Sequence, residues 1–245
     1  MAEEARVALV TGAAKRIGRA IALELAKCGC DIAVHCHTSR EEADETAEMI
    51  RKMDRRATVL AADLSDPEAA TALVGRTIEA LGSLNVLINN ASAYDRMNLS
   101  DFSLSAWNAT LAMNLTAPML LAHAAYPHLC ADHNGQIVNL LDIAAERPWP
   151  DHLAYCVSKA GLSTLTSALA RAMAPDVRVN GVAPGAALFP EGEDRATIKA
   201  ITRRIPALRL GTVEEIAATV RFMVCDATYL TGAILNVDGG RSIAW

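Results

Sequence analysis

Short apolar runs alternate with amphipathic segments along the whole chain. The apolar runs are rich in Val, Ile, Leu and Ala, as expected of strands buried on both faces of a parallel sheet. They predict strands at 5–10, 30–36, 57–64, 84–91, 135–142, 177–185 and 233–240. Between them, apolar residues recur at helical spacing, which predicts helices at 17–25, 41–52, 66–81, 105–130, 153–173, 194–205 and 214–225. Pro118 lies inside one of these helices and is expected to bend it.

The regular alternation of strand and helix predicts βαβ units, a parallel sheet and right-handed crossovers. No linker-like or low-complexity stretch interrupts the alternation. We therefore expect an α/β fold in which residues 1–245 form a single domain with a doubly wound parallel sheet. A stretch with Pro and Gly begins at Pro184 and leads into the helix predicted at 194–205, so we expect a substrate loop around 184–205.

Charge and hydropathy exclude several classes of protein. The 245 residues carry a formal net charge of -5 and no basic block, so we expect no nucleic-acid partner. No apolar run reaches the roughly 20 residues that a membrane helix needs, so we expect no membrane partner. Acidic residues precede the first apolar run, which is the wrong order for a secretory signal, and a cytoplasmic protein is expected.

The six cysteines do not have the spacing of a zinc site. Cys28 and Cys30 have no second pair to complete one, and no third ligand accompanies His35 and His37. We therefore expect no bound metal. The cysteines are interpreted as reduced and mostly buried.

Tyr155 and Lys159 stand four residues apart in the helix predicted at 153–173, so they share one face. A phenol has a pKa of about 10, and a cation within reach stabilises the phenolate and lowers that pKa. The pair can therefore act as a proton donor, although a Tyr and a Lys at this spacing also arise by chance on amphipathic helices. Asp142 stands at the expected end of the preceding strand, where ligands of open α/β sheets bind. That position favours the catalytic interpretation.

The first turn between strand and helix has the sequence TGAAKRIG at 11–18. Its small residues let backbone amides approach a pyrophosphate, and the start of the helix adds a favourable dipole. The usual dinucleotide fingerprint has three glycines, whereas here Gly12 and Gly18 remain and Arg16 stands where another is expected. The alternative interpretation is an ordinary tight turn.

The ends of the next strands carry polar residues that suit the rest of a dinucleotide. No acid precedes Glu41 at the end of the second strand, where Ser39 and Arg40, with help from His35 and His37, can hold the extra phosphate of NADP. The alternative for the histidines is core packing or a solvated strand end.

Three further polar sites follow. Asp63 can accept a hydrogen bond from the adenine amino group, or simply cap the next helix, as Asp66 could. Asn90, Ala91 and Ser92 suit a flat ring that passes close to the backbone, or form a plain turn. Asn114 is a mediocre helix former inside a predicted helix and can bind a water or a backbone carbonyl.

These positions, with APG at 183–185 and NVDGG at 236–240, together resemble the classical short-chain dehydrogenase/reductase family over essentially the whole chain. The resemblance implies a Rossmann-type fold, hydride transfer with a nicotinamide cofactor and a homotetramer. It implies that Tyr155 is the proton donor, that Lys159 binds the nicotinamide ribose and that Asn114 is a relay residue. The cofactor-binding residues that it implies are Gly12, Arg16, Ile17, Gly18, His37, Thr38, Ser39, Arg40, Asp63, Leu64, Asn90, Ala91, Ser92, Tyr155, Lys159, Pro184 and Gly185.

Two departures from the family's pattern resemble its pteridine reductase branch. Asp142 stands where the family usually has a serine, thirteen residues before the tyrosine, and Arg16 replaces a glycine of the cofactor motif. The segment HCHTSR at 35–40 also resembles the NADPH-binding segment of that branch, but Thr38 stands where those enzymes commonly have arginine, for which Arg40 is the candidate substitute. Tyr94 matches the position whose ring stacks on the pterin. The substrate-binding residues that the resemblance implies are Arg16, Ser92, Tyr94, Asp142, Trp149 and Tyr155.

The sequence therefore predicts NADPH-dependent reduction of a dihydropteridine such as dihydrobiopterin, with dihydrofolate as a further candidate. Asp142 and Tyr155 would form a coupled pair that passes a proton to a ring nitrogen. Trp149 and Phe189 would be pocket walls or merely pack their loops. One alternative is an NADPH-dependent ketoreductase that acts on a carbonyl with the same tyrosine and Lys159. Another is a dinucleotide-sensing protein that binds NADPH without turnover.

Overall fold

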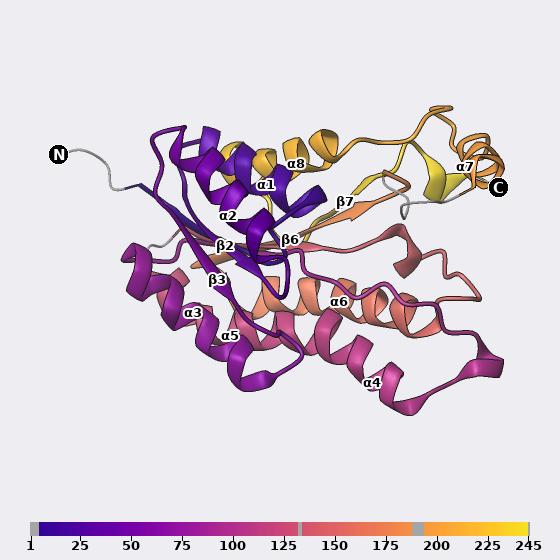
Figure 1. Cartoon of the computed structure of the whole chain (residues 1–245), viewed down its shortest axis with the longest axis horizontal. Helices are drawn as coiled ribbons and strands as arrows, with labels where there is room; N and C mark the ends of the chain where they lie inside the picture. The colour runs from indigo at the N-terminus through magenta and orange to yellow at the C-terminus, as the bar shows by residue number, and fades with distance from the viewer. Residues whose placement is uncertain (1–4, 132–133, 188–193, 245) are drawn as a thin grey trace.

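A single parallel sheet organises the computed structural model, which describes residues 5–131, 134–187 and 194–244. In these residues the sheet has seven strands in the order β3-β2-β1-β4-β5-β6-β7 (Figure 1). The order reverses between β1 and β4, so a crevice is expected at the carboxyl ends of these two strands. The strands are β1 Val7–Val10, β2 Asp31–Cys36, β3 Ala57–Ala61, β4 Val86–Asn89, β5 Gly135–Leu140, β6 Val177–Pro184 and β7 Ile234–Val237.

Helices cover both faces of this sheet. Figure 1 shows α1, α2 and α8 on one face and α3, α4, α5 and α6 on the other. Alternate residues of β1 enter the two core layers: Ala8 and Val10 pack under α1, whereas Val7 and Leu9 pack under α3 and α5. The helices are α1 Arg16–Lys27, α2 Arg40–Arg51, α3 Pro67–Leu81, α4 Leu104–Leu111, α5 Ala117–Ala131, α6 Leu153–Ala172, α7 Arg195–Thr202 and α8 Val213–Arg221. The expected doubly wound Rossmann-type α/β fold is therefore confirmed.

The predicted strands are present, but each is shorter than expected, and in two of them the shorter end affects a site residue. β3 ends at Ala61 and β5 ends at Leu140, so Asp63 and Asp142 lie beyond the ladder rather than inside it. Asp66, and not Asp63, caps α3 by accepting from the amide of Glu68. Part of the expected substrate loop, including Phe189, lies outside the described residues.

The long helix predicted at 105–130 is divided into α4 and α5 by a π-turn, Ala112–Thr116. Proline has no amide hydrogen, so Pro118 cannot donate to the carbonyl of Asn114, four residues earlier. The amide of Ala117 bonds instead to the carbonyl of Ala112, which widens the turn. We expected Pro118 to bend the helix; the structure shows a π-helical insertion just before it. None of the helices in the described ranges combines the length and apolar character that a bilayer crossing requires.

Candidate active site

A cavity of about 880 Å³ follows the carboxyl edge of the sheet from the glycine-rich turn to Tyr155. Of the residues predicted from the sequence, the cavity is lined by Gly12, Arg16, Ile17, Gly18, His35, His37, Leu64, Asn90, Ala91, Ser92, Tyr94, Asp142, Trp149, Tyr155, Lys159, Pro184 and Gly185. Five others do not line it, namely Thr38, Ser39, Arg40, Asp63 and Asn114.

The glycine-rich turn is held in place by β4. The hydroxyl of Thr11 accepts from the amides of Asn90 (2.8 Å) and Ala91 (3.0 Å). In return, the side-chain amide of Asn90 donates to the carbonyls of Thr11 (2.8 Å) and Gly12 (3.1 Å). Asn90 therefore braces the turn that would hold a pyrophosphate.

Arg16 adopts a backbone conformation that favours glycine. Its φ is 57°, in the left-handed region, where an L-residue with a Cβ is disfavoured by about 1 kcal/mol. The family's preference for glycine here thus has a conformational cause. An arginine that accepts this strain at the rim of the cavity points to a role for its side chain.

Gly18 cannot carry a side chain without disturbing the turn. A Cβ there would overlap the carbonyl oxygen of Gly12 and lie 2.6 Å from Nδ2 of Asn90. We expect Gly18→Ala to lower the free energy of unfolding by about 1–3 kcal/mol, the scale of overpacking, and to weaken dinucleotide binding. Thermal unfolding and fluorescence titration measure both effects. Gly75→Ala is the matched control, because a Cβ at Gly75 meets no atom within 4 Å, and it should stabilise α3 by about 0.5–1 kcal/mol. Equal effects of the two substitutions would contradict this account.

His35 is not available to hold a phosphate. This corrects the sequence-based suggestion that it helps to bind the extra phosphate of NADP. Its Nδ1 accepts from the amide of Gly12 (3.0 Å), so its Nε2 carries the hydrogen and donates to the carbonyl of Ala62 (3.1 Å). Burial lowers the pKa of His35 to about 4, so the ring is neutral at physiological pH. Core packing, the alternative interpretation, is correct for this residue.

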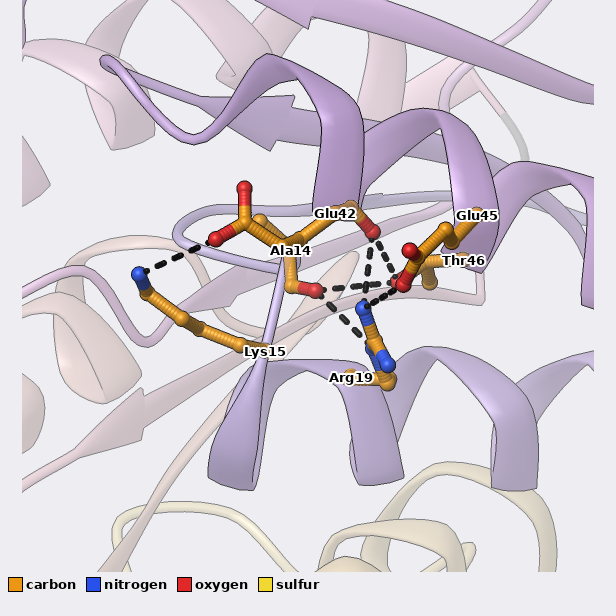
Figure 2. Close-up of polar contacts among 6 residues, drawn as sticks. All are labelled: Ala14, Lys15, Arg19, Glu42, Glu45 and Thr46. Carbon is orange, nitrogen blue, oxygen red and sulfur yellow. Dashed lines mark hydrogen bonds and ion pairs between the residues drawn. The ribbon is translucent and has the colours of Figure 1, made fainter.

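Arg40, which the sequence placed near the extra phosphate, and the nearby Lys15 are both paired with acids on the protein surface. Nε of Arg40 lies 3.0 Å from a carboxylate oxygen of Asp44, and Nζ of Lys15 lies 3.6 Å from Glu42. Figure 2 shows Lys15 beside a second network in which Arg19 bonds to the carbonyl of Ala14 and to α2. Exposed pairs of this kind are worth about 0–1 kcal/mol, so a phosphate could replace the acid in either of them.

Asp142 and Tyr155 form a hydrogen-bonded pair. The hydroxyl of Tyr155 donates to Oδ2 of Asp142 at 2.8 Å, and Oδ1 accepts from the amide of Ala144 at 2.8 Å. Burial raises the pKa of Asp142, and its hydrogen bonds and the charges of Lys159 and Arg241 oppose that shift. The carboxyl group is therefore closer to holding a proton than a surface aspartate is.

The expectation that Lys159 lowers the pKa of Tyr155 is wrong for this arrangement. Burial, and then the charge of Asp142, raise the pKa of Tyr155 well above its usual value. Nζ of Lys159 donates to the carbonyl of Leu140 (2.7 Å) and lies 5.7 Å from the centroid of the tyrosine ring. Tyr155 is thus a protonated donor. Burial also lowers the pKa of Lys159 to about 8.

The side chain of Asn114 is a structural clamp. Its Oδ1 accepts from the amide of Ala93 (2.8 Å) and the hydroxyl of Ser92 (3.2 Å). Its Nδ2 donates to the carbonyl of Ala93 (2.9 Å) and the hydroxyl of Ser158 (3.0 Å). The side chain therefore joins the loop after β4 to α6. A relay role would fall to the main-chain carbonyl of Asn114, which loses its helical partner at Pro118.

Aromatic rings pack against the ring of Tyr155. Tyr94 meets the ring of Tyr155 edge-on at 4.8 Å and stacks on His152 at 4.5 Å. The ring of Trp149 is nearly parallel to that of Tyr155, at 12° and 6.3 Å. Tyr94 and Trp149 both line the cavity, as the sequence predicted.

Arg241 and His152 are among the pocket residues that were missed from the sequence. Arg241 lies after β7, and its guanidinium is 5.7 Å from the ring of Trp149. The carboxyl ends of parallel strands share one edge, so the position of Arg241 after the last predicted strand was a usable signal. His152 offered no signal, since its place beneath Tyr94 depends on tertiary packing. No group of three or more His, Cys, Asp or Glu side chains in the described part of the chain is placed to hold a metal ion.

A nicotinamide dinucleotide fits the residues of this cavity. The braced glycine turn offers main-chain amides, and Lys15 and Arg16 offer positive charge. The buried Nζ of Lys159, which donates to the carbonyl of Leu140, lies beside the cavity. Such a cofactor would lie along the strand ends and place its reactive ring near Tyr155.

Comparisons with known proteins agree with this arrangement. Residues 12–242 match the family model described as enoyl-(acyl carrier protein) reductase. The chain is 33% identical to the 3-oxoacyl-[acyl-carrier-protein] reductase of Synechocystis, over 96% of each chain. Its structure matches acetoin dehydrogenase from Enterobacter cloacae with a TM-score of 0.92 and 32% identity, covering 100% of this chain and 98% of that one. It also matches a blue fluorescent protein from a metagenomic library in complex with NADPH, with a TM-score of 0.90 and 31% identity, over 96% and 97% of the two chains. The chain belongs to the classical short-chain dehydrogenase/reductase family of oxidoreductases.

Proposed function

We propose that this oxidoreductase reduces a dihydropteridine to its tetrahydro form with NADPH. The observation that carries the proposal is the hydrogen bond between Asp142 and Tyr155. Reduction of a ring C=N bond needs a proton at nitrogen as well as a hydride at carbon. Bound NADPH would supply the hydride. The protein would supply the proton.

The position and environment of Asp142 suit delivery of that proton. Its carboxyl group is largely desolvated, and its pKa is raised. Tyr155 would donate to the ring nitrogen, and the carboxyl of Asp142 would share its proton with the phenol oxygen. An ionised aspartate in the same place would repel the alkoxide that forms when a ketone is reduced.

The aromatic walls also suit a flat heterocycle. Tyr94 is half exposed and lies nearly perpendicular to Trp149, at 83° and 6.2 Å between ring centroids, so one ring can stack on a planar substrate while the other meets its edge. Arg241, over Trp149, adds a cation at the same end of the cavity.

A carbonyl compound is the second candidate substrate, and the comparisons support it more than a pterin. A relative is named 3-oxoacyl-[acyl-carrier-protein] reductase, and a structural neighbour is an acetoin dehydrogenase. Tyr155 and Lys159 would serve carbonyl reduction equally well. The deciding experiment follows NADPH absorbance with dihydrobiopterin, dihydrofolate and a panel of ketones. Turnover of ketones alone would exclude the pterin proposal, and NADPH binding without any turnover would favour a sensor.

NADPH is proposed as the cofactor because a structural neighbour was solved with it, and because no acid precedes Glu41 at the end of β2. Arg40 would have to leave Asp44 to reach the extra phosphate. The homotetramer and the cytoplasmic location stay predictions from the sequence.

We expect Arg40→Ala to weaken NADPH binding by about tenfold, because a hydrogen bond to a charged group contributes about 1.5–3 kcal/mol. NADH binding should be nearly unchanged. Dissociation constants for both dinucleotides give the answer, with Arg51→Ala as the control, since Arg51 lies in the same helix and pairs with Glu48. An equal loss for NADPH and NADH would show that Arg40 does not contact the extra phosphate.

A further inference from the structure

An arginine without an acidic partner lies in the active-site cavity, on the segment that follows β7. Arg241 begins the short turn Arg241–Ile243, and the central carbon of its guanidinium lies 5.7 Å from the centroid of the Trp149 ring. Both residues line the cavity. Within the described ranges, no carboxylate or carbonyl pairs with the guanidinium of Arg241. Its N–H donors are therefore available to an anion from outside the protein.

The backbone around Arg241 is fixed by two hydrogen bonds to the next residue, Ser242. The carboxylate of Asp238 accepts from the amide of Ser242 at 2.6 Å. Nε of Arg147 donates to the carbonyl of Ser242 at 2.9 Å. Because Arg147 and Trp149 belong to the same loop, the second bond ties the turn after β7 to the aromatic wall of the cavity. The cation and the wall are thus held in place before any ligand binds.

This cation lies far from the phosphate-binding end of the cavity. The glycine-rich turn follows β1, whereas Arg241 follows β7, and four steps from strand to strand separate β1 from β7 in the sheet. Neighbouring strands are about 4.8 Å apart, so β1 and β7 are about 19 Å apart. Lys15 and Arg16, at the glycine-rich turn, are the cations that suit the phosphates of a dinucleotide. Arg241 therefore faces the substrate end.

The other charged side chains at the substrate end would not exclude an anion. Asp151 already has a partner, since its carboxylate lies 3.0 Å from Nδ1 of His152. Oδ2 of Asp142 accepts from the hydroxyl of Tyr155 at 2.8 Å. Arg96 also lines the cavity and is exposed, so it adds a second positive charge. An incoming carboxylate would meet two guanidinium groups, and both acids are occupied.

We propose that Arg241 binds a carboxylate carried by the substrate, while the reacting group of the same molecule lies beside Tyr155. The planar guanidinium fork matches the two oxygens of a carboxylate, and a cation–π contact with Trp149 supports the fork. This inference rests on the proposed function only in placing the reacting group beside Tyr155, so it holds for a pterin or a carbonyl compound. Among the pterins it selects dihydrofolate, which carries carboxylates, over dihydrobiopterin, which carries none.

The test compares substrates that differ only in the carboxylate, at saturating NADPH. One pair is dihydrofolate and its dimethyl ester, and the other is 4-oxopentanoate and its methyl ester. We expect the parent to favour the acid of the pair that it reduces by about tenfold or more in kcat/KM, the scale of a hydrogen bond between charged groups. Arg241→Gln should abolish this preference by raising KM for the acid, with kcat for the ester nearly unchanged. Arg241→Lys, which keeps the charge, should restore part of the preference.

Arg204→Gln is the matched control, because Arg204 is exposed and is not among the residues that line the cavity, and it should keep the acid preference. The dissociation constant of NADPH should be the same in the parent and in Arg241→Gln. The dissociation constants of dihydrofolate and its dimethyl ester for the protein loaded with NADP⁺ give the same comparison without turnover.

The outcomes separate this inference from the proposed function. Reduction of 4-oxopentanoate alone, with a preference over its ester that Arg241→Gln abolishes, would reject the pterin and support the carboxylate site. Three results would overturn the inference: equal treatment of acid and ester by the parent, an acid preference that survives in Arg241→Gln, or weaker NADPH binding in that variant.

Discussion

Tyr155→Phe is expected to lower turnover by at least about 100-fold, the scale of general acid catalysis, with nearly unchanged dinucleotide binding. The substitution removes the hydroxyl that donates to Asp142 and keeps the ring that packs beside Tyr94 and Trp149. Turnover under saturating NADPH, together with the dissociation constant of NADPH, separates the loss of chemistry from the loss of binding.

Tyr229→Phe is the matched control, because Tyr229 is fully exposed and the substitution removes the same hydroxyl from the surface. Its turnover should equal that of the parent. Near-normal turnover of Tyr155→Phe, for whichever substrate proves active, would remove Tyr155 from the mechanism of both candidate reactions.

Asp142→Ser should reduce dihydropterin turnover sharply, by about 100-fold, and leave ketone turnover equal or higher. A serine hydroxyl can donate to a developing alkoxide, whereas it is a poor source of the proton that a ring nitrogen requires. Asp142→Asn keeps the size of the side chain and its bond with Ala144, but cannot supply the same proton, so it should also fail with pterins. Turnover of both substrate classes in the parent and both variants, across pH, is the measurement. Pterin reduction by Asp142→Ser at the parental rate would make Asp142 a structural residue.

Thermal unfolding across pH shows whether the variants are intact. The folded-state pKa of Asp142 is raised above its unfolded value, which is about 3.9. Its stabilising contribution is therefore complete below that unfolded pKa and is lost as the pH rises through the folded pKa. Above that range the ionised carboxylate disfavours the fold. Asp142→Asn should thus unfold at a higher temperature than the parent at neutral pH, and the difference should shrink in acid. An inactive but more stable variant would exclude unfolding as the cause.

The fold was predictable because the apolar runs of the inner strands, such as β1, β2, β4 and β5, are buried on both faces, and the segments between the strands are amphipathic. The position of the site was predictable as well, since the strand ends of a parallel sheet share one edge and so bring Asn90, Asp142 and Gly185 together. Both predictions depend only on the order of strands and helices along the chain.

Contacts between particular atoms were not predictable in the same way. The sequence placed both Asp142 and Lys159 beside Tyr155. The hydroxyl of Tyr155 does bond to Asp142, whereas Lys159 bonds to the carbonyl of Leu140. Likewise, the sequence suggested that His35 helps to hold a phosphate, but its Nδ1 accepts a hydrogen bond from the amide of Gly12. In each case several hydrogen-bond partners lie within reach of the side chain. Which of them it contacts depends on how the whole site packs when it is buried.

The bracing of the glycine-rich turn has a consequence for biosynthesis. Thr11 and Gly12 are made early, but their partner Asn90 lies 79 and 78 residues further along the chain. A ribosome-bound chain from which Asn90 has not yet emerged contains every residue of the turn, but it lacks the hydrogen bonds from Asn90 that hold the turn in shape. The ability to hold a dinucleotide therefore arises during translation only after β4 has emerged and docked beside β1. Cofactor in the surrounding solution can stabilise the nascent chain from that point onward and not before.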